Sequence, residues 1–247
     1  MIEGRIEGRV ARIALDRPEA HNALHQAAMR AMRRVLDDWA GREDVRALIL
    51  TGRGRSFCAG ASLGEVGAAD WSENPLTALC DALEAFPAPT IAALNGGVYG
   101  GGVEIALACD FRIGVEGMRA FAPPARLGIH YEPAGIARAM SRLGAQAARR
   151  MFLLAETFEA EALLAMGFLD WLVRPEALED RAEAVATTAA GLAPLAVRGM
   201  KRTILEISRG ALDPEAARAR IAACFASADH AEGLAAQREK RPPRFEG

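Results

Sequence analysis

The chain has 247 residues, of which 51% are hydrophobic and 6% aromatic, so it can bury one large core. Its formal net charge of −2 excludes a global basic field of the kind that holds a polyanion such as DNA, and is compatible with local arginines that bind a small anion. The four cysteines form no CxxC pair and have no histidine at metal-ligand spacing, which predicts a reduced protein with no metal site and no redox cofactor.

The long apolar stretches are interrupted by glycine, proline or charge before they reach membrane-spanning length, and the N-terminus lacks the pattern of a signal peptide. We therefore expect a cytoplasmic protein that does not bind a membrane. The chain begins with the tetrapeptide Ile-Glu-Gly-Arg twice, at residues 2–5 and 6–9. The repeat resembles a protease-cleavage linker added to recombinant proteins, and it is equally compatible with a strand that continues into Val10.

The first half of the chain predicts strands and helices in alternation. Runs rich in branched apolar residues predict strands over residues 10–15, 45–51, 90–94 and 110–115. Apolar residues at helical spacing predict helices over residues 25–40, from Pro75 onward, and around Glu104. This alternation indicates an α/β core.

From about Glu132 the pattern is mostly helical. The spacing predicts helices over residues 133–143, 145–154, 159–166, 175–191, 194–209 and 213–229, with one strand over residues 168–173. The apolar stripes of these helices exceed what isolated helices could bury. We therefore divide the chain into a core over residues 1–190 and a C-terminal helical region over residues 191–247, which packs on the core and on other copies of the chain.

Two of the predicted strands run into glycine-rich turns, at residues 52–62 and 95–102. Glycine lets a ligand approach bare backbone N–H groups, and Gly101 stands where a helix begins, so its amide suits a developing oxyanion. Glu104 follows one turn later. Neither turn has the spacing of a nucleotide-binding motif. Taken alone, the segment is also typical of a tight turn before a helix whose glutamate complements the helix dipole.

Three segments in this order resemble the crotonase superfamily, also called the enoyl-CoA hydratase/isomerase superfamily: residues 17–24 (RPEAHNAL), 57–63 (FCAGASL) and 95–104 (NGGVYGGGVE). The tail at residues 238–245 (REKRPPRF) is similar as well, so the resemblance covers nearly the whole chain. It implies a spiral of ββα units and a C-terminal helical region that builds trimers, often paired into hexamers. It also implies an acyl-CoA substrate and no separate cofactor, because coenzyme A is part of the substrate.

The resemblance also implies roles for individual residues. The N–H groups of Ala61 and Gly101 would form an oxyanion hole for the thioester carbonyl, and Glu104 would carry a proton or hold a water molecule. The residues implied to contact coenzyme A are Ala20 and His21 near the ADP part, and Ala59, Gly60, Ser62 and Leu63 along the pantetheine arm and adenine. Ser62 stands where the family usually has aspartate.

The second glutamate of family hydratases has no counterpart here. Counting back from Leu127 and Gly128 puts that position at Pro124, which has no proton to give, so the mechanism with two carboxylates does not carry over. Tyr131 stands three residues after the glycine, which resembles the methylmalonyl-CoA decarboxylases of the superfamily, although those enzymes have a histidine where Ala61 stands. Tyr131 is therefore a candidate second catalytic group, and a packed ring is the alternative interpretation.

We therefore expect a lyase or isomerase of the enoyl-CoA hydratase/isomerase family that acts through an enolate, with weak hydration of crotonyl-CoA. A decarboxylase of the same superfamily and a non-catalytic acyl-CoA-binding protein are the alternatives. RNA binding is disfavoured because Asp37 and Asp38 follow the arginines of the first helix, and a serine hydrolase because neither Ser56 nor Ser62 has an identifiable histidine partner. The predicted partners are the substrate and other copies of the chain, with no nucleic acid.

Overall fold

The computed structural model describes residues 2–62, 64 and 73–247. A six-stranded sheet forms its centre, in the order β1-β2-β3-β5-β7-β10. The strands are β1 (Ile2–Glu7), β2 (Val10–Leu15), β3 (Ala47–Gly52), β5 (Thr90–Leu94), β7 (Phe111–Val115) and β10 (Trp171–Val173). β1 and β2 pair antiparallel, and the other neighbours pair parallel. The tetrapeptide repeat thus forms an edge strand in register with β2.

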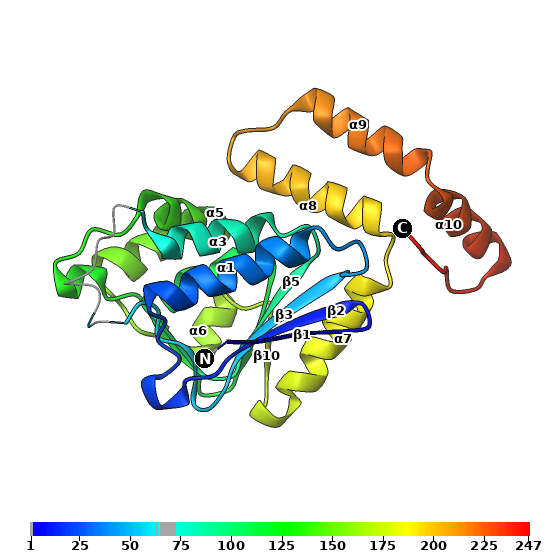
Figure 1. Cartoon of the computed structure of the whole chain (residues 1–247). Coiled ribbons are helices and arrows are strands. Elements are labelled where there is room, and N and C mark those ends of the chain that lie inside the picture. Colours follow the sequence, from blue (N-terminus) through cyan, green and yellow to red (C-terminus); the bar gives the residue numbers. More distant parts are fainter. Residues whose placement is uncertain (1, 63, 65–72) are drawn as a thin grey trace.

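Helices cover both faces of this sheet (Figure 1). α1 (Gln26–Ala40) and α3 (Pro75–Ala85) pack together on one side. α7 (Leu178–Ala190) lies on the other side, against β3, β5 and β7. Because both faces are covered, β3 and β5 are apolar along nearly their whole length, as the sequence predicted.

A second sheet of four short strands was not predicted from the sequence. Its order is β4-β6-β8-β9, formed by β4 (Ser56–Cys58), β6 (Gly97–Tyr99), β8 (Arg119–Phe121) and β9 (Phe158–Glu159). Each of the first three follows a strand of the large sheet, so the chain repeats a long strand, a short strand and a helical segment. β4 and β6 pair in parallel, with Ser56 opposite Gly97, and this pairing brings the two glycine-rich turns side by side.

α4 (Gly101–Ala108) is buried from Gly102 to its last residue. A helix that is apolar on nearly every side belongs in the interior, and Glu104 is the one charged residue that it carries there. The helix begins at the second glycine-rich turn and contacts α3 and α5 (Pro133–Leu153). This central position places the carboxylate of Glu104 inside the protein.

The two helices expected over residues 133–143 and 145–154 are present as the two parts of α5, which meet at a kink at Gly144, where φ is +80°. The second half of the chain differs from the prediction in two places. The single helix expected over residues 213–229 is wrong: α9 (Pro214–Phe225) ends early, and α10 (Ala228–Glu239) begins after Ser227, whose hydroxyl accepts from the His230 amide. The strand β9 was missed because it has only two residues.

The remaining helices are α6 (Ala160–Ala165) and α8 (Pro194–Ser208), with short 3-10 turns at Pro18–Ala20, Pro124–Leu127 and Pro175–Ala177. α8, α9 and α10 extend away from the sheet (Figure 1). α7 ends at Ala190, where the sequence placed the division between core and helical region; that division into two units stays a prediction. Among the described residues, no helix is both long and apolar enough to span a membrane.

Candidate active site

A cavity of about 850 Å³ opens where the two glycine-rich turns meet the segment from Phe121 to Glu132. Its wall includes Ala61 from the first turn, Gly101 and Glu104 from α4, and Tyr131 from the segment before α5. The structure therefore brings these four residues to one cavity, although Ala61 and Tyr131 are 70 positions apart in the sequence. A volume of this size accommodates a small organic ligand.

The amides of Ala61 and Gly101 lie close together. An ideal Cβ built on Gly60 would lie 2.3 Å from the amide nitrogen of Gly101. The nitrogen of Ala61 is about 3 Å from that same position, so the two nitrogens are at most about 6 Å apart. This separation is compatible with two N–H groups that share one oxygen at roughly 2.7–3.1 Å each. Within the described part of the chain, neither N–H donates to another group.

Asn22 holds the first turn in this position. Its buried side-chain amide donates to the carbonyls of Arg53, Ser56 and Phe57 at 2.9, 2.8 and 3.1 Å, and its carbonyl accepts from the Arg17 amide at 2.8 Å. Asn22 has φ +57°, a conformation that asparagine tolerates better than most residues. Its role was not predicted, although the residue stands within the segment 17–24 that carries the resemblance.

Glu104 is 2% exposed and is held by two donors. Arg138 Nη1 donates to its Oε1 at 2.7 Å, and the Tyr131 hydroxyl also donates to the carboxylate. Burial raises the pKa of Glu104 above its ordinary value, and the charge of Arg138 and the hydrogen bond from Tyr131 oppose that rise. Arg138 was missed from the sequence because its partner lies 34 positions away on another helix.

The phenol of Tyr131 is enclosed between Glu104 and Phe152. The rings of Tyr131 and Phe152 lie 4.8 Å apart between centroids. Burial and the neighbouring charge of Glu104 raise the pKa of the Tyr131 phenol well above its ordinary value. Its hydroxyl therefore stays protonated, orients the carboxylate, and is a poor acid toward a substrate.

No carboxylate stands at the position of the family's second glutamate, since Pro124 lines that part of the cavity wall. The wall does contain a second carboxylate, Glu132, directly after Tyr131. Glu132 is exposed, and its side chain does not cap α5, although it occupies the N-cap position. Its place in the cavity was not predicted from the sequence, because nothing in its local pattern distinguishes it from an ordinary helix-start residue.

The residues expected to contact coenzyme A are distributed unevenly. Ala20, Ala59 and Ser62 line the cavity, whereas His21 and Gly60 are not part of its wall, and Leu63 lies outside the described residues. The Ser62 hydroxyl is buried and has no hydrogen-bond partner among the described residues. A buried hydroxyl that faces a cavity without a partner gains a hydrogen bond when a polar ligand binds there.

The expectation that Ser56 has no histidine partner is wrong. His21 Nδ1 lies 2.9 Å from Ser56 Oγ, a contact that the sequence could not reveal because 35 positions separate the two residues. Ser56 is 3% exposed, and neither residue lines the cavity. The pair therefore holds the turn at residues 17–24 against β4 and does not present a nucleophile to a ligand.

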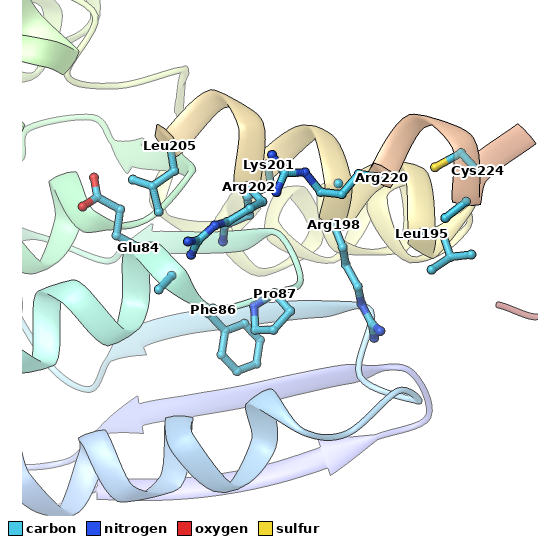
Figure 2. A pocket seen from close by; sticks show the side chains of 13 residues that line it. Glu84, Phe86, Pro87, Leu195, Arg198, Lys201, Arg202, Leu205, Arg220 and Cys224 are labelled. Carbon is cyan, nitrogen blue, oxygen red and sulfur yellow. The ribbon is translucent and has the colours of Figure 1, made fainter. Parts of the chain in front are cut away.

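A second, smaller cavity of about 380 Å³ lies between the end of α3 and helices α8 and α9 (Figure 2). Four cationic side chains surround it, but each is already paired within the protein. Arg198 donates to the carbonyls of Glu43 and Val45, which precede β3. Lys201 binds Asp110 at 2.6 Å, and Arg202 and Arg220 both bind Glu206. The first cavity is the candidate active site because its wall contains the Ala61 and Gly101 turns and the Glu104 carboxylate.

Comparisons with known proteins identify the family of this chain. Residues 5–247 match the family described as enoyl-CoA hydratase/isomerase. The chain is 36% identical over 241 residues to "Probable enoyl-CoA hydratase echA6" of Mycobacterium bovis, covering 96% of each protein. It is 32% identical to "Short-chain-enoyl-CoA hydratase" of Clostridium acetobutylicum, over 95% of this chain and 93% of that protein.

The fold agrees as well. The crystal structure of an enoyl-CoA hydratase from Bacillus anthracis superposes with a TM-score of 0.92 at 29% sequence identity, covering 100% of this chain and 99% of that one. The spiral of ββα units expected from the resemblance is therefore present, and the relatives named here do not favour the decarboxylase or the non-catalytic binding protein. The chain belongs to the enoyl-CoA hydratase/isomerase family and has its fold.

Proposed function

We propose that this protein is an enoyl-CoA hydratase/isomerase that binds an acyl-CoA in the cavity between the two glycine-rich turns. The observation that carries the proposal is that two amides, Ala61 and Gly101, which donate to no other group among the described residues, share one cavity wall with a buried carboxylate, Glu104. Such a wall can bind a carbonyl oxygen and move a proton next to it. Coenzyme A enters as part of the substrate, and no further cofactor is required.

The two amides stabilise the negative charge that develops on the thioester oxygen. When water adds to the double bond of an enoyl-CoA, or when a proton leaves the α-carbon, electrons move onto the carbonyl oxygen and an enolate forms. N–H groups fixed before the reaction stabilise that charge without rearranging, which contributes about 3–4 kcal/mol for a single donor. Gly101 adds the partial positive charge of the α4 N-terminus.

Glu104 acts as the proton carrier. In hydration it holds the attacking water and accepts its proton; in isomerisation it removes a proton from one carbon of the acyl chain and returns it to another. Its raised pKa suits both steps, because a general acid-base works best when its pKa approaches the working pH. Tyr131 orients the carboxylate from one side.

Hydration also needs a proton for the α-carbon after water has added. Pro124 cannot supply it, and Tyr131 is a poor acid in its present surroundings. Among the described residues, Glu132 is the other carboxyl in the cavity wall, so we assign it as the candidate donor. Because an exposed side chain is held less firmly than a buried one, this arrangement predicts weak hydration of crotonyl-CoA.

The proposal is tested by turnover. Purified protein is offered crotonyl-CoA, longer enoyl-CoAs, and branched or dicarboxylic acyl-CoAs, and the products are identified by mass. We expect products that have gained one water or have an unchanged mass with a moved double bond. Loss of carbon dioxide would instead identify a decarboxylase, and the absence of any turnover with tight acyl-CoA binding would identify a non-catalytic binding protein.

We further propose a homotrimer or hexamer in the cytoplasm. Support comes from the apolar side chains that α8 and α9 leave exposed in one copy: Met200, Ile204, Ile207, Ile221 and Phe225, each more than half exposed. Apolar surface of this kind on neighbouring helices marks an interaction surface. A second copy of the chain is the partner that the family resemblance implies.

A further inference from the structure

A group of buried charges lies behind Glu104, outside the cavity wall. Its centre is Arg138 on α5, which is 5% exposed and contacts three carboxylates. Nη1 donates to Glu104 at 2.7 Å, Nη2 to Asp81 at 2.8 Å, and both Nε and Nη2 to Glu84 at 3.3 Å. Asp81 and Glu84 belong to α3, so one guanidinium joins α3, α4 and α5.

The three carboxylates differ in the number of cations that contact them. Arg209, at the end of α8, binds both Asp81 and Glu84, at 3.3 and 2.6 Å. Glu84 also lies at the edge of the cavity between α3 and α8, where α8 approaches the core (Figure 2). Within the described ranges, Arg138 is the only cation that contacts Glu104. Among the described residues, the ionised form of Glu104 is therefore stabilised by one cation, Arg138, and by the hydrogen bond from the Tyr131 hydroxyl.

The two oxygens of Glu104 have different surroundings. Arg138 binds Oε1, whereas Oε2 lies beside Gly135, where an ideal Cβ would be 2.8 Å from it and 2.5 Å from the Tyr131 ring. Arg138 and the Tyr131 hydroxyl both donate to this carboxylate, and two donors fix its orientation, which proton transfer requires. A bulkier residue than glycine at position 135 would displace this oxygen.

We propose that Arg138 is a positioning residue, which fixes the Glu104 carboxylate at the cavity wall and keeps it ionised so that it can accept a proton. The inference rests on the proposed role of Glu104 as proton carrier. Arg138 does not line the cavity, so it acts through Glu104 and makes no contact with substrate. Without this cation, burial would favour the neutral carboxylic acid, which cannot accept a proton.

The groups that face Glu104 include charges of both signs, so the role of Arg138 can be tested by shifting the pKa of Glu104 in either direction. These groups are Arg138 from α5, Tyr131 from the segment before it, and Cys80 and Asp81 from α3, while Glu84 of α3 contacts Arg138. Burial raises the pKa of the Cys80 thiol well above its usual range, so Cys80 carries no charge. The charge of Asp81 raises the pKa of Glu104, in the opposite direction to the charge of Arg138.

The experiment compares the acidic limb of the kcat/KM-pH profile, which follows ionisation of Glu104 in the free enzyme. Arg138→Met should move this limb to higher pH by about one unit or more, with KM near its normal value because the cavity wall is unchanged. Arg138→Lys should move it less, since it keeps a charge. Asp81→Asn should move the acidic limb to lower pH. The Asp81 side chain is half-exposed, so we expect this variant to fold.

Arg209→Met is the matched control, because Arg209 binds the same α3 carboxylates and does not touch Glu104. Its acidic limb should stay in place. Opposite shifts for the Arg138 and Asp81 variants support the inference, and an unmoved limb in folded variants overturns it. If Arg138→Met does not fold, the same comparison is made with Arg138→Lys and Asp81→Asn: opposite shifts of the acidic limb support the inference, and an unmoved limb overturns it.

Glu104→Gln separates this inference from the proposed function. A large loss of turnover in Glu104→Gln, together with an unmoved limb in the Arg138 variants, overturns the inference alone. Normal turnover in Glu104→Gln overturns both, because Arg138 would then have no catalytic carboxylate to position.

Discussion

Gly60 has no room for a side chain, since its φ is +77° and an added Cβ would lie 2.3 Å from the Gly101 amide nitrogen. Gly60→Ala must therefore push apart the two turns that carry the Ala61 and Gly101 amides. We expect kcat to fall by about 10²–10³, the loss typical of one missing oxyanion donor. Steady-state turnover of an enoyl-CoA checks this.

Gly117→Ala is the control for Gly60→Ala. Gly117 has nearly the same φ, +76°, but open space where a Cβ would stand. It therefore imposes the same backbone strain without the collision, and its kcat should stay close to normal. Equal losses in both variants would show that strain, and not the spacing of the two amides, explains the effect.

Single substitutions at Glu132 and Tyr131 also identify the second proton donor. If Glu132 protonates the α-carbon, Glu132→Gln should lower the hydration rate by about 10²-fold, the lower end of the range for general acid catalysis. Tyr131→Phe removes only a donor to Glu104 and should lower the rate less. Initial rates and incorporation of deuterium at the α-carbon measure both effects. A larger loss in Tyr131→Phe would assign the proton to the tyrosine.

At the scale of elements, β4 and β6 decide where the site forms. Each has three residues and follows a long buried strand, and their parallel pairing aligns the turn that leads to Ala61 with the turn that leads to Gly101. The cavity therefore depends on a small sheet of short strands, whose Phe57 and Val98 are fully buried in the core. The helices behind it supply the charges that hold Glu104.

α8 is attached to this framework through Lys201. Its ammonium binds Asp110 at 2.6 Å and the Ala88 carbonyl at 2.9 Å, and both charged side chains are mostly buried. Among the described residues, Lys201→Met leaves the Asp110 carboxylate with the two donors of Thr90, so we expect a loss of about 1.5–3 kcal/mol in the free energy of unfolding. Urea denaturation measures it, and hydrogen exchange should locate the loosened amides in α8.

Arg202→Met is the comparison for Lys201→Met. Arg202 binds Glu206 four residues later on the same helix, and its side chain is 59% exposed. Glu206 is mostly buried but keeps its contact with Arg220, so removing the exposed Arg202 should change the unfolding free energy by only about 0–1 kcal/mol. Similar losses in the two variants would mean that α8 is not held to the core by the Lys201–Asp110 pair.

At the scale of the whole molecule, the exposed apolar side chains of α8 and α9 predict assembly. Sedimentation should give a mass three or six times the 26.3 kDa of one chain at micromolar concentration. Ile204→Lys places a charge in the middle of this surface, where the isoleucine is 62% exposed in one copy, and should shift the mass toward the monomer. A monomeric wild-type protein would contradict the proposed assembly.

The sequence by itself determined the class of the fold and most of the long elements. Buried parallel strands are continuously apolar and amphipathic helices repeat their apolar positions, so β2, β5 and α1 were predicted within one or two residues of their observed bounds. The local sequence pattern did not predict elements that depend on strand pairing or on capping. The short strands β4 and β9 form because they pair with β6 and β8, and α9 ends where Ser227 caps the next helix.

The tertiary structure alone decided how the candidate site is built. The sequence indicated Gly101 and Glu104 through the glycine turn before a helix, and Ala61 and Tyr131 only through a resemblance. It did not indicate Arg138, the contact between His21 and Ser56, or the place of Glu132 in the cavity wall. These depend on contacts between residues distant in sequence, or on where a loop lies against a cavity. Contacts of these two kinds produce no periodic or local pattern in the sequence, because the packing of buried strands and helices brings the partners together.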